Sequence, residues 1–158
     1  MPEPIACESP VEVLKRLSVD FSLHDHVPIR TRTDIERELG LPVDMLLKTM
    51  VFHTGEEFVL AALPIRQRVH YGRLARAVGV SRAKLRQAAP EELEALAMEP
   101  GGASPVCGRS SVITVFDESV REMDRVYCGS GRADQTVEVD ARELMRLLDP
   151  VITSVVAG

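Results

Sequence analysis

Residues 47–63 read LKTMVFHTGEEFVLAAL, and this stretch decides the fold. Two apolar, β-prone runs, Leu47 to His53 and Phe58 to Leu63, flank the tetrapeptide TGEE at 54–57. Apolar runs joined by a short glycine-containing turn are typical of a β-hairpin. We therefore predict that the chain is built around an antiparallel strand pair at these residues.

Helices and further strands are predicted on both sides of the hairpin. Before it, we expect a helix capped by Ser9-Pro10, a strand at 21–24, and a short helix that begins with a capping box at 33–36 and stops at Gly40. After it, we expect helices at 71–78, from Pro90 and at 141–148, strands at 112–116, 125–128 and 136–139, a Pro/Gly loop at 98–108, and near 83–87 an element whose type stays open. This order predicts one α+β domain over residues 1–158, with a largely antiparallel or mixed sheet.

Composition places the chain among ordinary globular domains. It has 158 residues, of which 45% are hydrophobic and 27% charged. No apolar run approaches the roughly 18 residues that span a bilayer, and the start of the chain is acidic rather than a basic leader, so we expect a soluble, cytoplasmic protein without membrane contact. The cysteines (Cys7, Cys107 and Cys128) are far apart and the histidines lack HExxH or HxxxH spacing, so we expect no disulfide framework, metal or cofactor.

Lys48 is the most informative single residue. In a strand it shares one face with Met50 and Phe52, while the other face is also apolar. Burying its ammonium group is costly unless the group reaches a cleft, a partner or an anionic ligand. A lysine that extends to solvent near a strand end is the alternative, and the spacing leaves both open.

Two glycine loops are candidate binding elements. Successive N–H groups in PGGASP at 100–105 could form an oxyanion hole, although a simple turn is the alternative. GSGR at 129–132 lies between predicted strands, which favours a hairpin turn, and no helix follows it as a phosphate fingerprint requires. No GxSxG motif is present, so hydrolysis would use water or a substrate group against a carbonyl polarised by backbone donors and a lysine.

Positive charge is concentrated in one segment of an acidic chain. The net charge is -5, yet residues 65–89 contain no Asp or Glu and hold seven of the 19 basic residues. Within this basic segment, Arg66, Arg68, Arg73 and Arg76 are candidate contacts to RNA phosphates. A solvated, arginine-rich helix face is the alternative.

Taken in order, four short motifs resemble the YbaK/EbsC family, the freestanding relatives of the bacterial prolyl-tRNA synthetase editing domain. The resemblance covers about residues 21–148. Its carriers are LKT at 47–49, a GxxxP loop as GGASP at 101–105, FDES at 116–119 and VYCGSGR at 126–132. The order and spacing of these motifs carry the resemblance, since each is short.

This resemblance implies a compact α+β fold with a curved sheet, and deacylation of misacylated tRNA, most often tRNA for proline carrying a small residue such as Cys, Ala, Ser or Thr. It gives Lys48 a positioning role near the ester and terminal adenosine, and gives backbone donation to Gly101, Gly102 and Ala103. The substrate-binding residues that it implies are Thr49, Ser104, Pro105, Gly129, Ser130 and Gly131. The implied partners are aminoacyl-tRNA and prolyl-tRNA synthetase. A noncatalytic tRNA or small-ligand module with the same pocket, or a hydrolase of another aminoacyl ester or adenylate, is the alternative.

Overall fold

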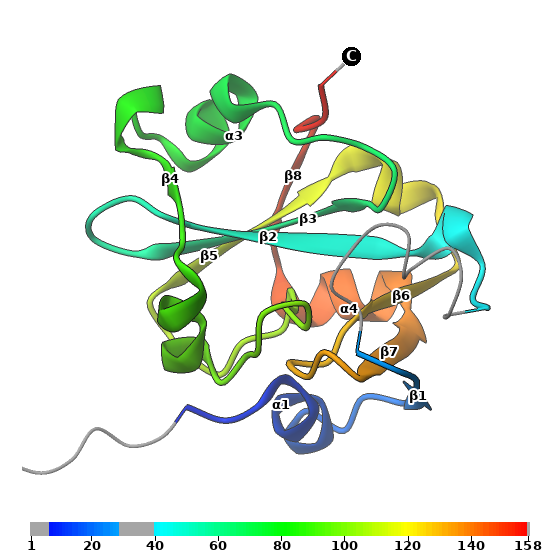
Figure 1. The fold of residues 1–158 in the computed structure, drawn as a ribbon. Coiled ribbons are helices and arrows are strands. Elements are labelled where there is room, and N and C mark those ends of the chain that lie inside the picture. Colours follow the sequence, from blue (N-terminus) through cyan, green and yellow to red (C-terminus); the bar gives the residue numbers. More distant parts are fainter. Residues whose placement is uncertain (1–6, 29–39, 158) are drawn as a thin grey trace, which may run out of the picture.

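The computed structural model describes residues 7–28 and 40–157 (Figure 1), so the helix expected at 33–36 lies outside the described residues. The helices are α1 (Pro10–Arg16), α3 (Tyr71–Val78) and α4 (Ala141–Leu148), with 3₁₀ helices at Val43–Met45, Arg82–Lys84, Pro90–Leu96 and Glu118–Glu122. The strands are β1 (Phe21–Asp25), β2 (Leu47–His53), β3 (Phe58–Pro64), β4 (Arg86–Gln87), β5 (Val112–Asp117), β6 (Arg125–Gly129), β7 (Gln135–Asp140) and β8 (Val151–Thr153). The α+β class is confirmed.

The strands form two sheets rather than one. β1, β7 and β6 form a three-stranded antiparallel sheet. The other sheet has the order β4-β2-β3-β5-β8, in which β2 pairs antiparallel with β3 and β4, and β5 pairs parallel with β3 and β8. A single parallel bridge between Leu46 and Tyr127 links the two sheets. The predicted mixed sheet is therefore confirmed in its strand directions but is divided into two.

Local signals explain why the predicted hairpin and helices form where expected. The hairpin turn is closed by the Thr54 N–H, which donates to the Glu57 carbonyl at 3.0 Å, with Gly55 at φ +97°. α3 ends at Gly79, which has φ +75°, a conformation that glycine adopts without steric cost. α4 begins at Asp140, whose side chain accepts from the Glu143 N–H.

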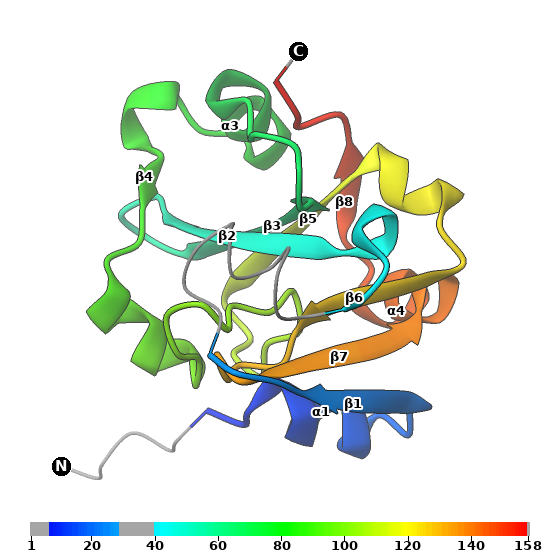
Figure 2. The ribbon, with the colours of Figure 1, turned by 45° about the vertical axis from the view of Figure 1, so that its right-hand side comes forward.

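The chain beyond α4 adds a strand that the sequence did not predict. β8 pairs with β5 through Val115–Val151, Phe116–Ile152 and Asp117–Thr153. The following residues run beside the segment that leads into α3, where Val69 bridges Val156 (Figure 2). The C-terminal segment, residues 151–157, is therefore part of the folded domain.

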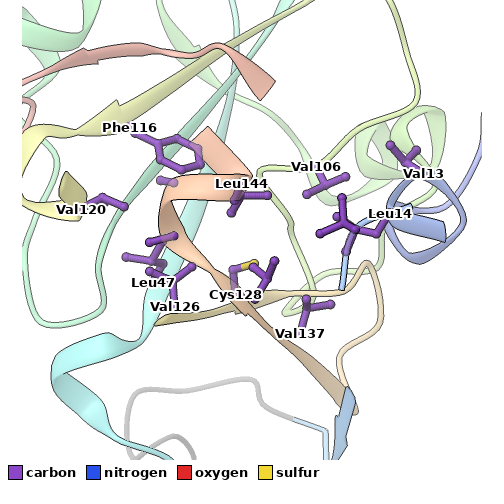
Figure 3. Close-up of a cluster of buried hydrophobic side chains, with 14 residues drawn as sticks. Val13, Leu14, Leu47, Val106, Phe116, Val120, Val126, Cys128, Val137 and Leu144 are labelled. Carbon is purple, nitrogen blue, oxygen red and sulfur yellow. The ribbon is translucent and has the colours of Figure 1, made fainter. Parts of the chain in front are cut away.

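Buried side chains form clusters on both faces of the five-stranded sheet. Leu47, Phe116, Val126 and Leu144 belong to the cluster that packs the two sheets and α4 together, as Figure 3 shows. α3 covers one face through a cluster that joins Phe52 to Leu74 and Ala75. A third cluster joins Val51 and Leu60 to Leu93 and Leu96 of the helix Pro90–Leu96, which follows β4 on the other side of the sheet (Figure 1). Within residues 7–28 and 40–157, no helix is long and apolar enough to cross a membrane.

Candidate active site

The two glycine loops pack directly against each other. The Gly131 N–H donates to the Gly102 carbonyl at 2.8 Å, and the Glu99 N–H donates to the Gly131 carbonyl at 2.7 Å. A Cβ atom added at Gly129 would lie 1.9 Å from the Ala103 carbonyl oxygen, and one added at Gly102 would lie 2.4 Å from the Arg132 carbonyl carbon. Only glycine fits at these two positions. We call residues 99–105 and 129–132 together the glycine junction.

The serines of the glycine junction have structural partners. The Ser104 hydroxyl accepts from the Val106 N–H at 3.0 Å. The Ser130 hydroxyl donates to the Gln135 carbonyl at 2.9 Å and accepts from the Arg132 N–H at 3.2 Å. Both serines are buried. In this structure these predicted substrate-binding residues therefore stabilise the loops through their hydroxyl groups. Pro105, also buried, completes the same turn region.

A cavity of about 500 Å³ lies between the glycine junction and the edge of β2. β2 is flanked on this side by the Leu46–Tyr127 bridge at its start and by β4 at its end. The cavity borders the strand between these two contacts, and its lining residues are Thr49, Met50, Val51, Gln87, Ala88, Pro90, Leu93, Pro100, Gly101 and Ala103. Three residues predicted from the sequence therefore meet in one cavity wall.

The backbone donors of the glycine junction differ in availability. The Gly102 N–H donates to the Glu99 carbonyl at 2.9 Å, which closes a turn. Among the described residues, no acceptor is recorded for the N–H groups of Gly101 and Ala103, and both residues line the cavity. These two groups are the donors that a carbonyl oxygen or an oxyanion in the cavity could meet.

Thr49 adds a polar side chain to the cavity wall. The residue is only 9% exposed, and its hydroxyl oxygen has no hydrogen-bond partner within the described part of the chain. Leaving a buried hydroxyl without a partner costs on the order of 1–3 kcal/mol, so such atoms are uncommon in folded proteins. The hydroxyl oxygen has almost no accessible surface of its own, so a polar ligand in the cavity would become its partner only after a small movement of the side chain.

Lys48 is half-buried in β2, paired opposite Leu63. Strand alternation puts its side chain on the face shared with Met50 and Phe52, whereas Thr49 lies on the other face. The described lining of the cavity includes Thr49 and Met50 but not Lys48, so contact between the amine and the glycine junction stays a prediction.

An ion pair fixes the far wall of the cavity. The Arg86 guanidinium in β4 donates to both carboxylate oxygens of Glu92, with N–O distances of 2.7 and 3.0 Å. The Ala89 N–H also donates to Glu92, at 2.9 Å. These hydrogen bonds, that of Arg86 above all, lower the pKa of Glu92 to about 2. The pair joins β4 to the helix Pro90–Leu96, and neighbouring residues of both elements line the cavity.

A polar cluster beside the glycine junction was not predicted from the sequence. Thr136 pairs with Gly129 across the sheet, and its hydroxyl lies 2.8 Å from Nε2 of His26. Farther along the same face, Glu138 contacts His24 at 2.8 Å and Arg125 at 2.6 Å, and these hydrogen bonds lower the pKa of its carboxyl group. The alternation of polar residues in 135–140 was the available signal, because it marks one face of β7 as polar.

The predicted RNA-contacting arginines lie away from the cavity. Arg73 and Arg76 belong to α3, which covers the opposite face of the five-stranded sheet (Figure 1). Arg66 lies 3.7 Å from Asp44, whereas Arg68 and Arg76 are exposed and have no recorded side-chain partner among the described residues. The structure therefore groups the arginines with one another but not with the glycine junction.

The described residues support neither a metal site nor Cys107 or Cys128 as a nucleophile. No group of three His, Cys, Asp or Glu side chains suitable for a metal ion occurs within 7–28 and 40–157. Burial raises the pKa of Cys107 to about 11 and that of Cys128 to about 12, so neither thiol is ionised near neutral pH.

Comparisons with known proteins identify a family and a fold. Residues 26–147 match the family model of the aminoacyl-tRNA editing domain. The fold matches the crystal structure of the hypothetical protein APE2540 with a TM-score of 0.79 and 22% identity, covering 95% of this chain and 100% of that one. It also matches a protein described as a "putative trans-editing enzyme for prolyl tRNA synthetase", with a TM-score of 0.76 and 23% identity, covering 94% and 96% of the two chains. At these identities the two structures show the fold alone.

Proposed function

The chain belongs to the aminoacyl-tRNA editing domain family, and on that premise we propose that it hydrolyses the ester between a wrong amino acid and its tRNA. The observation that carries this proposal is the cavity wall itself. Two N–H groups without recorded acceptors in the described chain, those of Gly101 and Ala103, lie in the same wall as Thr49. Such a set of neutral donors suits the carbonyl oxygen of an ester.

The proposed reaction needs no covalent intermediate. Water adds to the ester carbonyl carbon, the tetrahedral intermediate places negative charge on the former carbonyl oxygen, and the bond to the ribose oxygen then breaks as that oxygen takes a proton. Backbone donors that hold the developing oxyanion stabilise this intermediate. A bound water or a neighbouring ribose hydroxyl can carry the protons, and an aminoacyl ester is activated enough for orientation to contribute much of the acceleration.

We assign Lys48 to positioning the terminal adenosine and the ester by its positive charge. Its place in β2, the strand that borders the cavity, supports this role. Gly102 acts indirectly, because its N–H closes the turn with Glu99 that presents Gly101 and Ala103. The buried hydroxyls of Ser104 and Ser130 each stabilise their own loop.

Small amino acids on tRNA for proline are the proposed substrates. A cavity of about 500 Å³, open along a strand edge, admits a small aminoacyl group with part of the terminal nucleotide. The structural match to a protein described as a "putative trans-editing enzyme for prolyl tRNA synthetase" supports the choice of tRNA. The basic segment, with Arg66, Arg68, Arg73 and Arg76, is proposed to contact the tRNA backbone, and prolyl-tRNA synthetase is the proposed partner in the cytoplasm.

A deacylation assay tests this proposal. Proline tRNA is charged separately with alanine, cysteine, serine, threonine and proline, and its deacylation is compared for the wild type, Lys48→Ala and Lys15→Ala. We expect turnover of at least one mischarged tRNA, a loss of about 100-fold in Lys48→Ala, and no loss in Lys15→Ala, whose lysine is exposed in α1, outside the basic segment.

Two results would contradict the assignment. Hydrolysis at the spontaneous rate for every charged tRNA, with tight binding retained, would make the protein a noncatalytic binding module. Full activity of Lys48→Ala would remove Lys48 from the site while leaving the backbone donors in place.

A further inference from the structure

A second hollow, of about 270 Å³, lies on the other side of the molecule from the glycine junction. It is bounded by α3 and by the residues that end β8, and its lining residues are Arg73, Arg76, Ala77, Thr153 and Ser154. Figure 2 shows the C-terminal segment passing beside α3. Two guanidinium groups and two hydroxyl-bearing residues therefore meet in a hollow whose described lining contains no carboxylate.

Arg73 is held in place by the C-terminal segment. Its Nη1 donates to the Val156 carbonyl at 2.9 Å and to the Ser154 hydroxyl at 3.2 Å. The segment is itself fixed, because the His70 N–H donates to the Val155 carbonyl at 2.7 Å. A guanidinium group anchored through one nitrogen keeps its other N–H groups in a fixed plane, which favours a planar, bidentate contact with a phosphate.

Arg76 supplies the second cation one helical turn farther along. It is exposed and has no recorded partner among the described residues, so its charge is available to a ligand. Asp117, which pairs with Thr153 across the sheet, does not compete for it. Its carboxylate accepts from the Val155 N–H at 3.0 Å and from the N–H and hydroxyl of Ser119.

We propose that this hollow, formed jointly by α3 and the C-terminal segment, binds one phosphate group of an RNA backbone. The inference rests on the proposed function, because the RNA it names is the acceptor stem of the tRNA substrate. The surface around the hollow supports an RNA backbone as the source of this phosphate group. Residues 65–89 carry no acidic residue, and Arg68 and Lys84 add exposed positive charge outside the hollow, as an extended polyanion requires. A free phosphate ion would need only the hollow and not the positive charge around it.

The two arginines have different roles in this site. Arg76 contacts the phosphate mainly by its charge, so a lysine would partly replace it. Arg73 contacts it through a guanidinium plane that Ser154 and Val156 orient, so Arg73→Lys keeps the charge but loses the orientation. A diffuse positive surface would not distinguish these substitutions.

The test measures binding of uncharged tRNA at several salt concentrations, using the full chain. The variants are Arg76→Ala, Arg76→Lys, Arg73→Lys and, as a control, Arg142→Ala in α4, where the arginine is also exposed. We expect Arg76→Ala to weaken binding about tenfold near 0.1 M salt and to reduce the slope of log Kd against log salt by about 1. Arg142→Ala should change neither quantity, and Arg73→Lys should weaken binding more than Arg76→Lys does. Thermal unfolding of each variant checks that the fold is intact.

The outcomes separate this inference from the proposed function. If Arg76→Ala and Arg142→Ala have the same slope as the wild type, the phosphate site is wrong, whether or not the protein deacylates tRNA. If free inorganic phosphate at millimolar concentration binds as tightly as the RNA and abolishes the Arg76 effect, the hollow is a small-anion site and the RNA assignment is wrong. If no charged tRNA is hydrolysed while the Arg76 effect on RNA binding persists, the phosphate site stands and the proposed catalysis fails.

Discussion

The glycine junction and the basic segment differ in the groups that they offer to a substrate: backbone atoms in the first and charged side chains in the second. In the glycine junction, backbone atoms from loops about 30 residues apart are in van der Waals contact, and a single methyl group would not fit at Gly129 or Gly102. In the basic segment, long side chains extend to solvent from α3 and its neighbours, and several have no recorded partner within the described residues. The first region depends on packing and should tolerate no added volume. The second depends on charge and should respond to salt.

Gly129→Ala, in the glycine junction, should have the largest effect on stability and activity. The new Cβ would lie 1.9 Å from the Ala103 carbonyl oxygen, which is backbone and cannot rotate away. We expect the free energy of unfolding to fall by about 3 kcal/mol and deacylation to be lost even in the folded fraction, because Ala103 must move. Chemical denaturation and the deacylation assay measure the two effects.

Gly72→Ala is the matched control in the basic segment. An added Cβ there meets only the His70 ring, at 3.2 Å, and the position is helical, where alanine is favoured over glycine. Stability should be unchanged or slightly higher. If Gly129→Ala is as stable and as active as Gly72→Ala, the close packing of the glycine junction does not determine the site.

Much of the fold was predictable because its signals are local. The hairpin at 47–63, the bounds of α3 and those of α4 follow from turn residues, from Gly79 and from the Asp140 cap. β8 was not predicted, because three residues carry no period of their own and the strand is defined by its pairing with β5. The division into two sheets is likewise set by strand pairing between distant parts of the chain, such as that of β1 with β7.

The site was predictable only in part for the same reason. The sequence and the family resemblance pointed to Thr49, Gly101 and Ala103, which the structure brings to one cavity, and to Lys48, whose contact with that cavity stays a prediction. They could not show that the Gly102 N–H is used within a turn. The GSGR segment connects β6 to the antiparallel β7, as its hairpin-turn pattern predicts, but the pattern could not show that this connection also packs against another loop. The basic segment was read as one unit, whereas the structure engages Arg86 with Glu92 and leaves Arg76 exposed.

Thr49→Val, in the cavity wall next to the glycine junction, should have an effect of intermediate size on activity. The substitution keeps the shape of the side chain and removes a buried hydroxyl that has no recorded partner in the described chain. We expect the free energy of unfolding to stay the same or to rise by about 1 kcal/mol, while deacylation falls about tenfold because the ester loses a donor. Denaturation and single-turnover deacylation measure the two quantities.

Thr114→Val is the control for this pair of effects, because Thr114 lies in β5 and outside the cavity lining. It should leave the deacylation rate unchanged. A Thr49→Val protein that is destabilised and fully active would show that the hydroxyl serves the fold rather than the substrate.

Glu92→Gln should have the smallest effect, and a pH-dependent one. Hydrogen bonds from Arg86 and from the Ala89 N–H hold the folded-state pKa of Glu92 at about 2, below its ordinary value of 4.5. The unfolded chain therefore binds the proton more tightly, and the contribution of the pair to stability is fully present above about pH 4.5 and is lost as the pH falls toward 2. We expect the difference in urea midpoint between the wild type and Glu92→Gln to stay constant from about pH 7 to about pH 4.5 and to shrink as the pH is lowered further toward 3.

Glu91→Gln provides the comparison, because this neighbouring residue is exposed and no ion pair is recorded for it among the described residues. Its difference from the wild type should be small at every pH. Because Glu92 joins β4 to the wall of the cavity, Glu92→Gln should also raise the KM for charged tRNA slightly without lowering kcat. A midpoint difference for Glu92→Gln that does not change with pH would mean that the Arg86–Glu92 pair contributes nothing as an ion pair, and that the wall is held by the packing of Leu93 and Leu96 alone.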